Sequence, residues 1–81
     1  MRYTVTAVIR PGEQSGYVAE CVEIAVTTQG ETLDQTASNL RDAVALHLDG
    51  EDLQALGFGA NPAIIFTCEM EPVHALERAT E

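Results

Sequence analysis

Acidic and histidine side chains gather shortly after the middle of the chain. His47 is followed by carboxylates at positions 49, 51 and 52. Histidine and carboxylate groups together bind metal ions or act as acid–base catalysts. No second group of ligands follows at the spacing that metal sites use, and a polar or cationic side chain is itself favourable at a helix C-terminus. We therefore interpret this run as the solvated end of a helix.

Three further carboxylates, Glu20, Asp34 and Glu69, and the thiol of Cys21 are the other groups with catalytic potential. Metal-dependent nucleases use clustered carboxylates, and cysteine nucleophiles need a neighbouring base. Nothing in the sequence places the carboxylates within reach of one metal ion, and no histidine lies near Cys21. A phosphate-binding glycine loop ends in a lysine, which this chain lacks. We expect that the chain is not an enzyme and that it binds no metal and no cofactor. A metal-dependent enzyme is the third of three hypotheses, after two binding functions.

The charge balance of the chain is strongly acidic. Its formal net charge is −9, with 13 Asp and Glu residues against four arginines. Nucleic-acid binding depends on basic patches, so direct binding of DNA or RNA is disfavoured. Opposite potentials steer the association of proteins, which makes a basic protein a suitable partner. Acidity that serves only solubility explains the composition equally well.

The length of the chain and its cysteine content limit the number of domains and the cellular compartments that we expect. A chain of 81 residues forms one domain, and the small core of such a domain favours a dimer or larger oligomer. Cys21 and Cys68 lie in apolar runs, so we expect free, buried thiols in a reducing cytoplasm. The N-terminus alternates and does not resemble a signal peptide. No apolar run reaches the length of a membrane span, about 20 residues, and a cytoplasmic protein is expected.

One helix is predicted over residues 32–48. Thr32 and Gln35 have the spacing of a capping box, in which the Gln side chain returns to the amide of the cap residue. Gly50 suits the left-handed conformation that follows a helix C-cap. An apolar stripe at helical spacing is formed by Leu33, Ala37, Leu40, Val44 and Leu48. This stripe must pack on the rest of the domain.

Four strands are predicted, over residues 2–10, 17–22, 25–29 and 64–70. The first three follow one another closely enough to form an antiparallel meander. The expected fold class is α+β, an antiparallel sheet in βββαβ order with one long helix packed on one face and a short C-terminal helical tail. The domain covers residues 1–71, and the tail covers residues 72–81.

The sheet face away from the helix is unusually apolar for a surface in contact with water. Exposed apolar patches of some size mark interaction sites. We therefore predict that this face, or a free sheet edge, forms an interface with a second copy or a partner. The candidate residues of the oligomer interface are Val8, Val18, Val22 and Ile65.

The first fifty residues resemble the HicB-like family, the antitoxin side of HicA–HicB toxin–antitoxin systems. The matching residues are Gly16-Tyr17-Val18-Ala19, Thr28-Gln29-Gly30-Glu31-Thr32-Leu33, and then Ala37, Asn39, Ala43 and Leu48. The family fold, a meander, a helix and a returning strand, agrees with the predicted order of elements. A Pro-Asp-Leu-Pro-Gly-Cys-like segment of the family has no counterpart at residues 21–26. The chain resembles a short form without the C-terminal DNA-binding domain of full antitoxins.

The resemblance implies binding, not catalysis. HicB-like antitoxins sequester a small basic mRNA-cleaving toxin, which an acidic chain complements. The candidate partner-binding residues are Glu20, Asp34, Asp42, Asp49 and Glu51. The expected partners are a HicA-like toxin and the chain itself. The alternative is an orphan HicB-like oligomeric module that binds another protein, or only itself, and neutralises no toxin.

Overall fold

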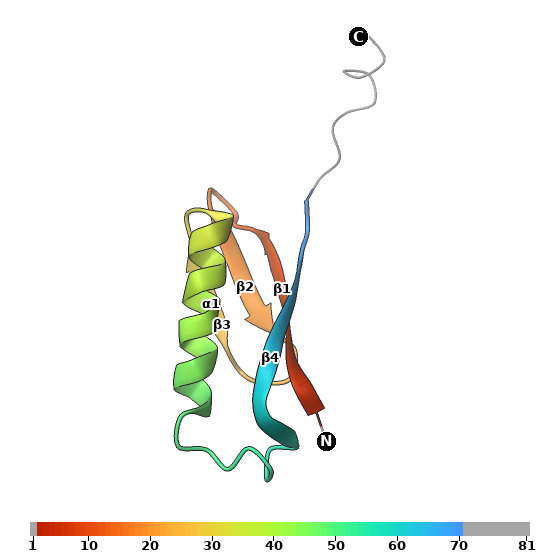
Figure 1. Ribbon diagram of the computed structural model, residues 1–81. Coiled ribbons are helices and arrows are strands. Elements are labelled where there is room, and N and C mark those ends of the chain that lie inside the picture. The colour runs from red at the N-terminus through yellow and green to blue at the C-terminus, as the bar shows by residue number, and fades with distance from the viewer. Residues whose placement is uncertain (1, 71–81) are drawn as a thin grey trace, which may run out of the picture.

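The chain folds as three strands, a helix and a fourth strand, in the predicted order. The computed structural model describes residues 2–70. The elements are β1 (Arg2–Pro11), β2 (Tyr17–Cys21), β3 (Thr27–Gly30), α1 (Leu33–Leu48) and β4 (Phe58–Cys68) (Figure 1). The α+β class is therefore confirmed. The helical tail predicted for residues 72–81 lies outside the described residues.

The four strands form one mixed sheet in the order β3-β2-β1-β4. β2 is antiparallel to both β1 and β3, whereas β4 is parallel to β1. The prediction of a wholly antiparallel sheet is therefore wrong at β4. The reason is the crossover: α1 carries the chain back along the sheet, so β4 runs in the direction of β3, which is also the direction of β1.

α1 begins at the predicted cap. The hydroxyl of Thr32 accepts a hydrogen bond from the amide of Gln35 at 3.0 Å. The side chain of Gln35 accepts from the amide of Glu31 at 2.7 Å, one residue before the predicted donor. At the other end, Gly50 adopts a φ of 74° just after the C-cap, as its position predicted.

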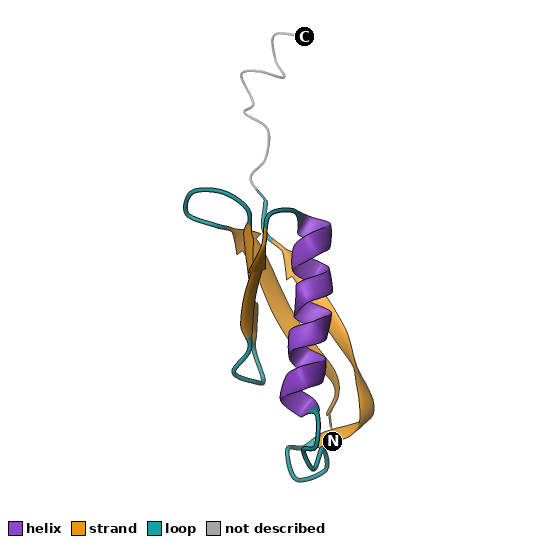
Figure 2. Cartoon of the chain, turned by 90° about the vertical axis from the view of Figure 1, so that its left-hand side faces the viewer, coloured by secondary structure: helices purple, strands orange, loops and turns teal. Residues whose placement is uncertain are grey.

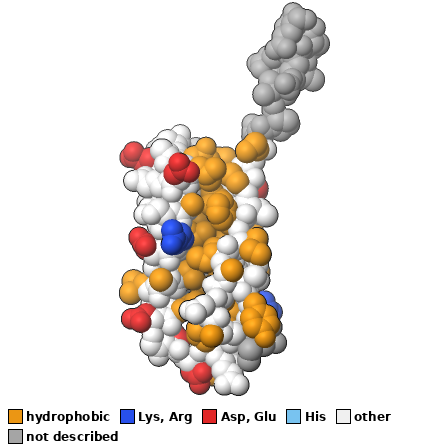
Figure 3. All heavy atoms as spheres, viewed as in Figure 1, with side chains coloured by type: hydrophobic (Ala, Val, Ile, Leu, Met, Phe, Trp, Pro, Cys, Tyr) orange, Lys and Arg blue, Asp and Glu red, His pale blue; other side chains and the backbone are white. Residues whose placement is uncertain are grey.

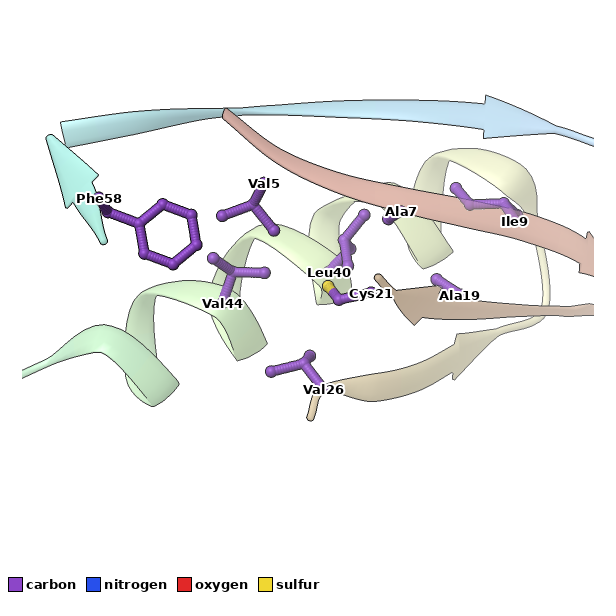
Figure 4. Close-up of a cluster of buried hydrophobic side chains, with 9 residues drawn as sticks. All are labelled: Val5, Ala7, Ile9, Ala19, Cys21, Val26, Leu40, Val44 and Phe58. Carbon is purple, nitrogen blue, oxygen red and sulfur yellow. The ribbon is translucent and has the colours of Figure 1, made fainter. Parts of the chain in front are cut away.

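The core lies between α1 and one face of the sheet (Figure 2). Side chains of β1, β2, α1 and the start of β4 converge there (Figure 4). Its buried apolar members are Val5, Ala7, Ile9, Ala19, Cys21, Val26, Leu40, Val44 and Phe58. Thr36 is also fully buried, which the apolar stripe did not predict. Its hydroxyl donates to the carbonyl of Thr32 at 2.7 Å, so burial leaves no polar group unsatisfied.

β4 begins six residues earlier than predicted, and it does so through an irregularity. The register shifts where Arg2 pairs with Phe58 but Thr4 pairs with Ala63. Within the extra segment Asn61 has a φ of 51°. Tyr3, near the start of β1, is 66% exposed. The shift removes a regular neighbour for Tyr3, and its ring lies instead against Gly59, where a Cβ would stand 2.6 Å from a ring carbon.

Gly30 allows the start of α1 to pack directly on β3. A Cβ at Gly30 would stand 2.6 Å from the hydroxyl oxygen of Thr36 and 2.7 Å from its backbone nitrogen. We expect Gly30→Ala to lower the free energy of unfolding by about 1–3 kcal/mol, because backbone must move to admit the methyl group. Thermal unfolding measures the change. Ala45→Ser, which adds one atom at an exposed helix position, is the control, and equal stability of the two variants would contradict the close packing.

Candidate protein-interaction surface

Three of the predicted contact residues, Asp34, Asp42 and Asp49, lie on the outer side of α1, and Asp42 and Asp49 also border a hollow that Asn61, Pro62 and Ile64 of β4 line. All three are exposed. An α-helix turns about 100° and rises about 1.5 Å per residue, so these carboxylates fall within an arc of about 80° along about 22 Å of axis. Among residues 2–70 no salt bridge involves them. Glu51, also exposed, follows the end of the helix. We call these four residues the acidic stripe.

Leu46 interrupts the acidic stripe with an apolar side chain. It follows Asp42 by four residues and precedes Asp49 by three, so all three side chains lie on neighbouring turns of one helix side. Leu46 is 77% exposed. We did not select this residue from the sequence, although its position outside the apolar stripe was a signal that it points away from the core. An exposed leucine among carboxylates resembles the apolar centre and polar rim of a protein interface.

Glu20 does not belong to the acidic stripe. It points to the sheet face opposite α1, because its neighbours Ala19 and Cys21 point into the core. Its carboxylate accepts a hydrogen bond from the guanidinium of Arg10 at 2.7 Å. This hydrogen bond, together with the charge of Glu20, raises the pKa of Arg10. The structure therefore separates Glu20 from the other predicted contacts and neutralises it within the chain.

The predicted oligomer interface lies on the same helix-free face. Val8 pairs with Glu20, Val18 pairs with Arg10, and Ile65 pairs with Thr6. Val22, just beyond β2, is 67% exposed. The valines of β1 and β2 are thus neighbours of the Arg10–Glu20 ion pair. This face is more polar than the sequence pattern suggested, because the pattern did not show that Arg10 lies across the sheet from Glu20.

A second uncovered apolar surface lies between α1 and β4, where Figure 3 shows a band of hydrophobic side chains. A groove of about 300 Å³ is lined by Ala37, Leu40, Arg41, Pro62, Ile64 and Phe66. α1 lies closest to β3 and β2, and the second half of β4 stays only partly covered. Phe66 pairs with the buried Ala7 and points to the helix side, but it stays 42% exposed. We call this feature the α1–β4 groove.

The two cysteines are free and cannot form a disulfide in this fold. Cys21 pairs with Ala7 and Cys68 pairs with Ile9, so β1 lies between them. Strands two places apart are separated by about 10 Å, which is too far for a disulfide. Burial, followed by the charge of Glu23, raises the pKa of Cys21. A raised pKa lowers the fraction of Cys21 that is present as the thiolate, which is the form that acts as a nucleophile.

Glu23 is a structural carboxylate. Its side chain is only 9% exposed, and it accepts a hydrogen bond from the amide of Thr6 at 2.7 Å. Arg2 lies 3.7 Å from the other carboxylate oxygen. Burial alone would raise the pKa of Glu23, but the hydrogen bonds with Thr6 and the charge of Arg2 outweigh burial and lower it. The carboxylate of Glu23 thus accepts the hydrogen bond of the Thr6 amide, which lies on the edge of β1 beyond the last residue of β2.

No three His, Cys, Asp or Glu side chains between residues 2 and 70 come together as metal ligands would. Within the same range, no helix has both the length and the apolar character that crossing a bilayer requires. Comparison with protein-family models, curated proteins and solved structures found no match. The HicB-like assignment and the toxin partner are therefore proposals.

We expect Glu23→Gln to destabilise the protein at neutral pH by on the order of 1 kcal/mol, since the charged acceptor is lost. The lowered pKa means that the ionised carboxylate stabilises the fold above its ordinary value of 4.5 and that this contribution is lost as the pH falls through the folded-state pKa. Denaturant unfolding at several pH values measures the difference. Glu20→Gln, at an exposed ion pair, should change little. A difference that stays constant down to acidic pH would contradict this role.

Proposed function

We propose that the chain is a protein-binding module of the HicB-like type, which binds a small basic mRNA-cleaving toxin and blocks its active site. The observation that carries the proposal is the acidic stripe, with the exposed side chain of Leu46 among its carboxylates. Such a surface complements a positively charged protein whose substrate is RNA. The residue resemblance to HicB-like antitoxins supports the same class of partner.

Electrostatic attraction and an apolar contact have separate roles in this proposal. The carboxylates of Asp34, Asp42, Asp49 and Glu51 steer the basic partner and increase the rate of association. Leu46, once covered, supplies buried apolar area at the centre of the contact. Glu20 contributes neither electrostatic steering nor apolar area, because it lies on the helix-free face of the sheet and pairs with Arg10. The toxin is inhibited by steric occlusion, so the module itself needs no catalytic group.

A second candidate function is that of an orphan module which only associates with itself or binds another protein. The α1–β4 groove and the exposed β4 side chains favour it, because apolar surface of this kind is normally covered. The two candidates differ in one property of the partner. A toxin must be basic and must lose RNA-cleaving activity when bound, whereas a self-associating chain requires neither.

Affinity purification from the native host at low salt tests the proposed function. We expect a stoichiometric small basic protein that cleaves RNA when free and is inhibited when this chain is added. Recovery of the chain alone, or of a protein without ribonuclease activity, would overturn the antitoxin proposal. A toxin-like reading frame beside the gene is a second, independent observation in favour.

Reversing charge in the acidic stripe should impair binding of that toxin. We expect Asp42→Arg combined with Asp49→Arg to slow association by about tenfold or more at low salt and to flatten its salt dependence. The control reverses Glu13 and Glu31, two exposed acids outside α1, and has the same net charge. Stopped-flow association measures both. Equal slowing of the two variants would show a net-charge effect and not a binding surface.

Leu46→Ala should weaken the same complex mainly through faster dissociation, because buried apolar contacts act on the lifetime of a complex. Stability should be unaffected, since the side chain is 77% exposed in the free protein. Surface plasmon resonance separates the two rates. An unchanged dissociation rate would remove Leu46 from the interface.

A further inference from the structure

Within residues 2–70, no other segment pairs with the outer edge of β4, which is long and uncharged. It spans 11 residues, FGANPAIIFTC, and contains no charged side chain. It pairs with β1 on one side and is the outermost strand on the other. Proteins normally blunt such edges with charges, proline, bulges or short strands, because an open edge pairs with another chain. Here the proline and the irregularity are confined to its first half, and residues 63–68 have neither.

The opposite edge of the sheet shows the protection that β4 lacks. β3 has only four residues. The side-chain amide of Asn39, on α1, donates to the carbonyl of Gln29 at 2.8 Å. Among the described residues, the edge of β4 is therefore open to the addition of a strand. The edge of β3 is less suited to it, because β3 is short and the carbonyl of Gln29 already accepts a hydrogen bond from Asn39.

The outward-facing backbone groups of β4 follow from its pairing with β1. The amide of Glu69 donates to the carbonyl of Ile9 at 2.7 Å, so odd-numbered residues of this strand face β1. Backbone groups alternate sides along a strand. Ile64, Phe66 and Cys68 therefore present their amides and carbonyls outward. Pro62, which has no amide hydrogen, also falls on the outward side, where proline is tolerated in an edge strand.

We propose that the β4 edges of two copies pair antiparallel about a twofold axis at Ile65, which joins the two sheets into one. Ile64 of each copy then exchanges both backbone hydrogen bonds with Phe66 of the other. Their side chains meet on the helix side, beside the α1–β4 groove, and such aromatic–β-branched pairs stabilise a sheet. On the helix-free face the two Ile65 side chains, each 55% exposed in one copy, face each other.

Charge favours a second copy at this edge over other places on the surface. Two chains that each carry a net charge of −9 repel one another, so they associate best where neither presents a charged group. β4 offers 11 such residues in succession. In the proposed register Glu69 lies opposite Asn61 of the other copy, so no two carboxylates are placed face to face. The interface is isologous and closes after two copies.

The acidic stripe lies on the outer side of α1 and takes no part in the β4–β4 hydrogen bonds of this dimer. Self-association through β4 therefore does not depend on the toxin and does not compete for Leu46. The two interactions also respond oppositely to salt. Salt screens the repulsion between two acidic copies and strengthens the dimer, whereas it weakens attraction for a basic toxin.

A charge-swap experiment at the twofold axis tests the proposal on the purified full chain. Sedimentation equilibrium of the unaltered protein should show a dimer of about twice 8.7 kDa. Ile65→Lys and Ile65→Glu should each weaken dimerisation by at least about tenfold, because like charges then lie directly opposite. An equimolar mixture of the two variants should restore a dimer, because opposite charges then meet at the axis.

Two control variants identify the surface. Leu46→Lys places the same charge on the exposed side of α1 and should leave the dimer intact. Val22→Lys places it on the helix-free face away from β4, and should also leave it intact, whereas stacking of two sheet faces would be disrupted. A monomer for the unaltered protein at high micromolar concentration, a dimer that survives Ile65→Lys, or a mixture that stays monomeric would each overturn the proposal. Circular dichroism of the Ile65 variants separates a lost contact from a lost fold.

Discussion

A single α-helix is narrower than the sheet on which it packs. With its side chains a helix is about 10–12 Å across, whereas four strands at a spacing of about 4.8 Å span about 14 Å between the outer backbones. α1 follows β3 after a short turn and packs on β3 and β2. The side chains of β1 are buried beneath it, but those of β4 are only partly covered. The α1–β4 groove and the open edge both follow from this placement.

The same placement divides the surface into two regions with different chemistry. The outer side of α1 carries carboxylates around one exposed leucine, and β4 carries an uncharged apolar edge at the opposite side of the groove. The first region suits a basic partner and the second suits another copy of an acidic chain. Because a β4–β4 contact leaves α1 open to solvent, a dimer presents two acidic stripes on the same side of one continuous sheet. The proposed dimer would therefore carry two equivalent surfaces for the proposed partner.

Local signals in the sequence predicted the elements, whereas long-range geometry required the structure. The cap at Thr32 and the glycine after the helix were predictable because capping chemistry depends on neighbouring residues. The direction of β4 was not, since it depends on α1 carrying the chain back along the sheet before β4 begins. The pairing of Arg10 with Glu20 and the exposure of Tyr3 likewise depend on register. The acidic residues of α1 that we predicted as partner contacts are exposed, and their role in binding stays a prediction; the exposed Leu46 beside them was not among the predicted contacts.

Hydrogen exchange of β4 measured as a function of protein concentration tests most directly whether this strand is an uncovered edge that another copy completes. The amides of Ile64, Phe66 and Cys68 face outward, and those of Ile65 and Thr67 face β1. The account predicts that the first group exchanges rapidly in dilute solution and becomes protected as the concentration rises, while the second group is protected throughout. Exchange of the outward amides that is slow in dilute solution, or fast at every concentration, would contradict it.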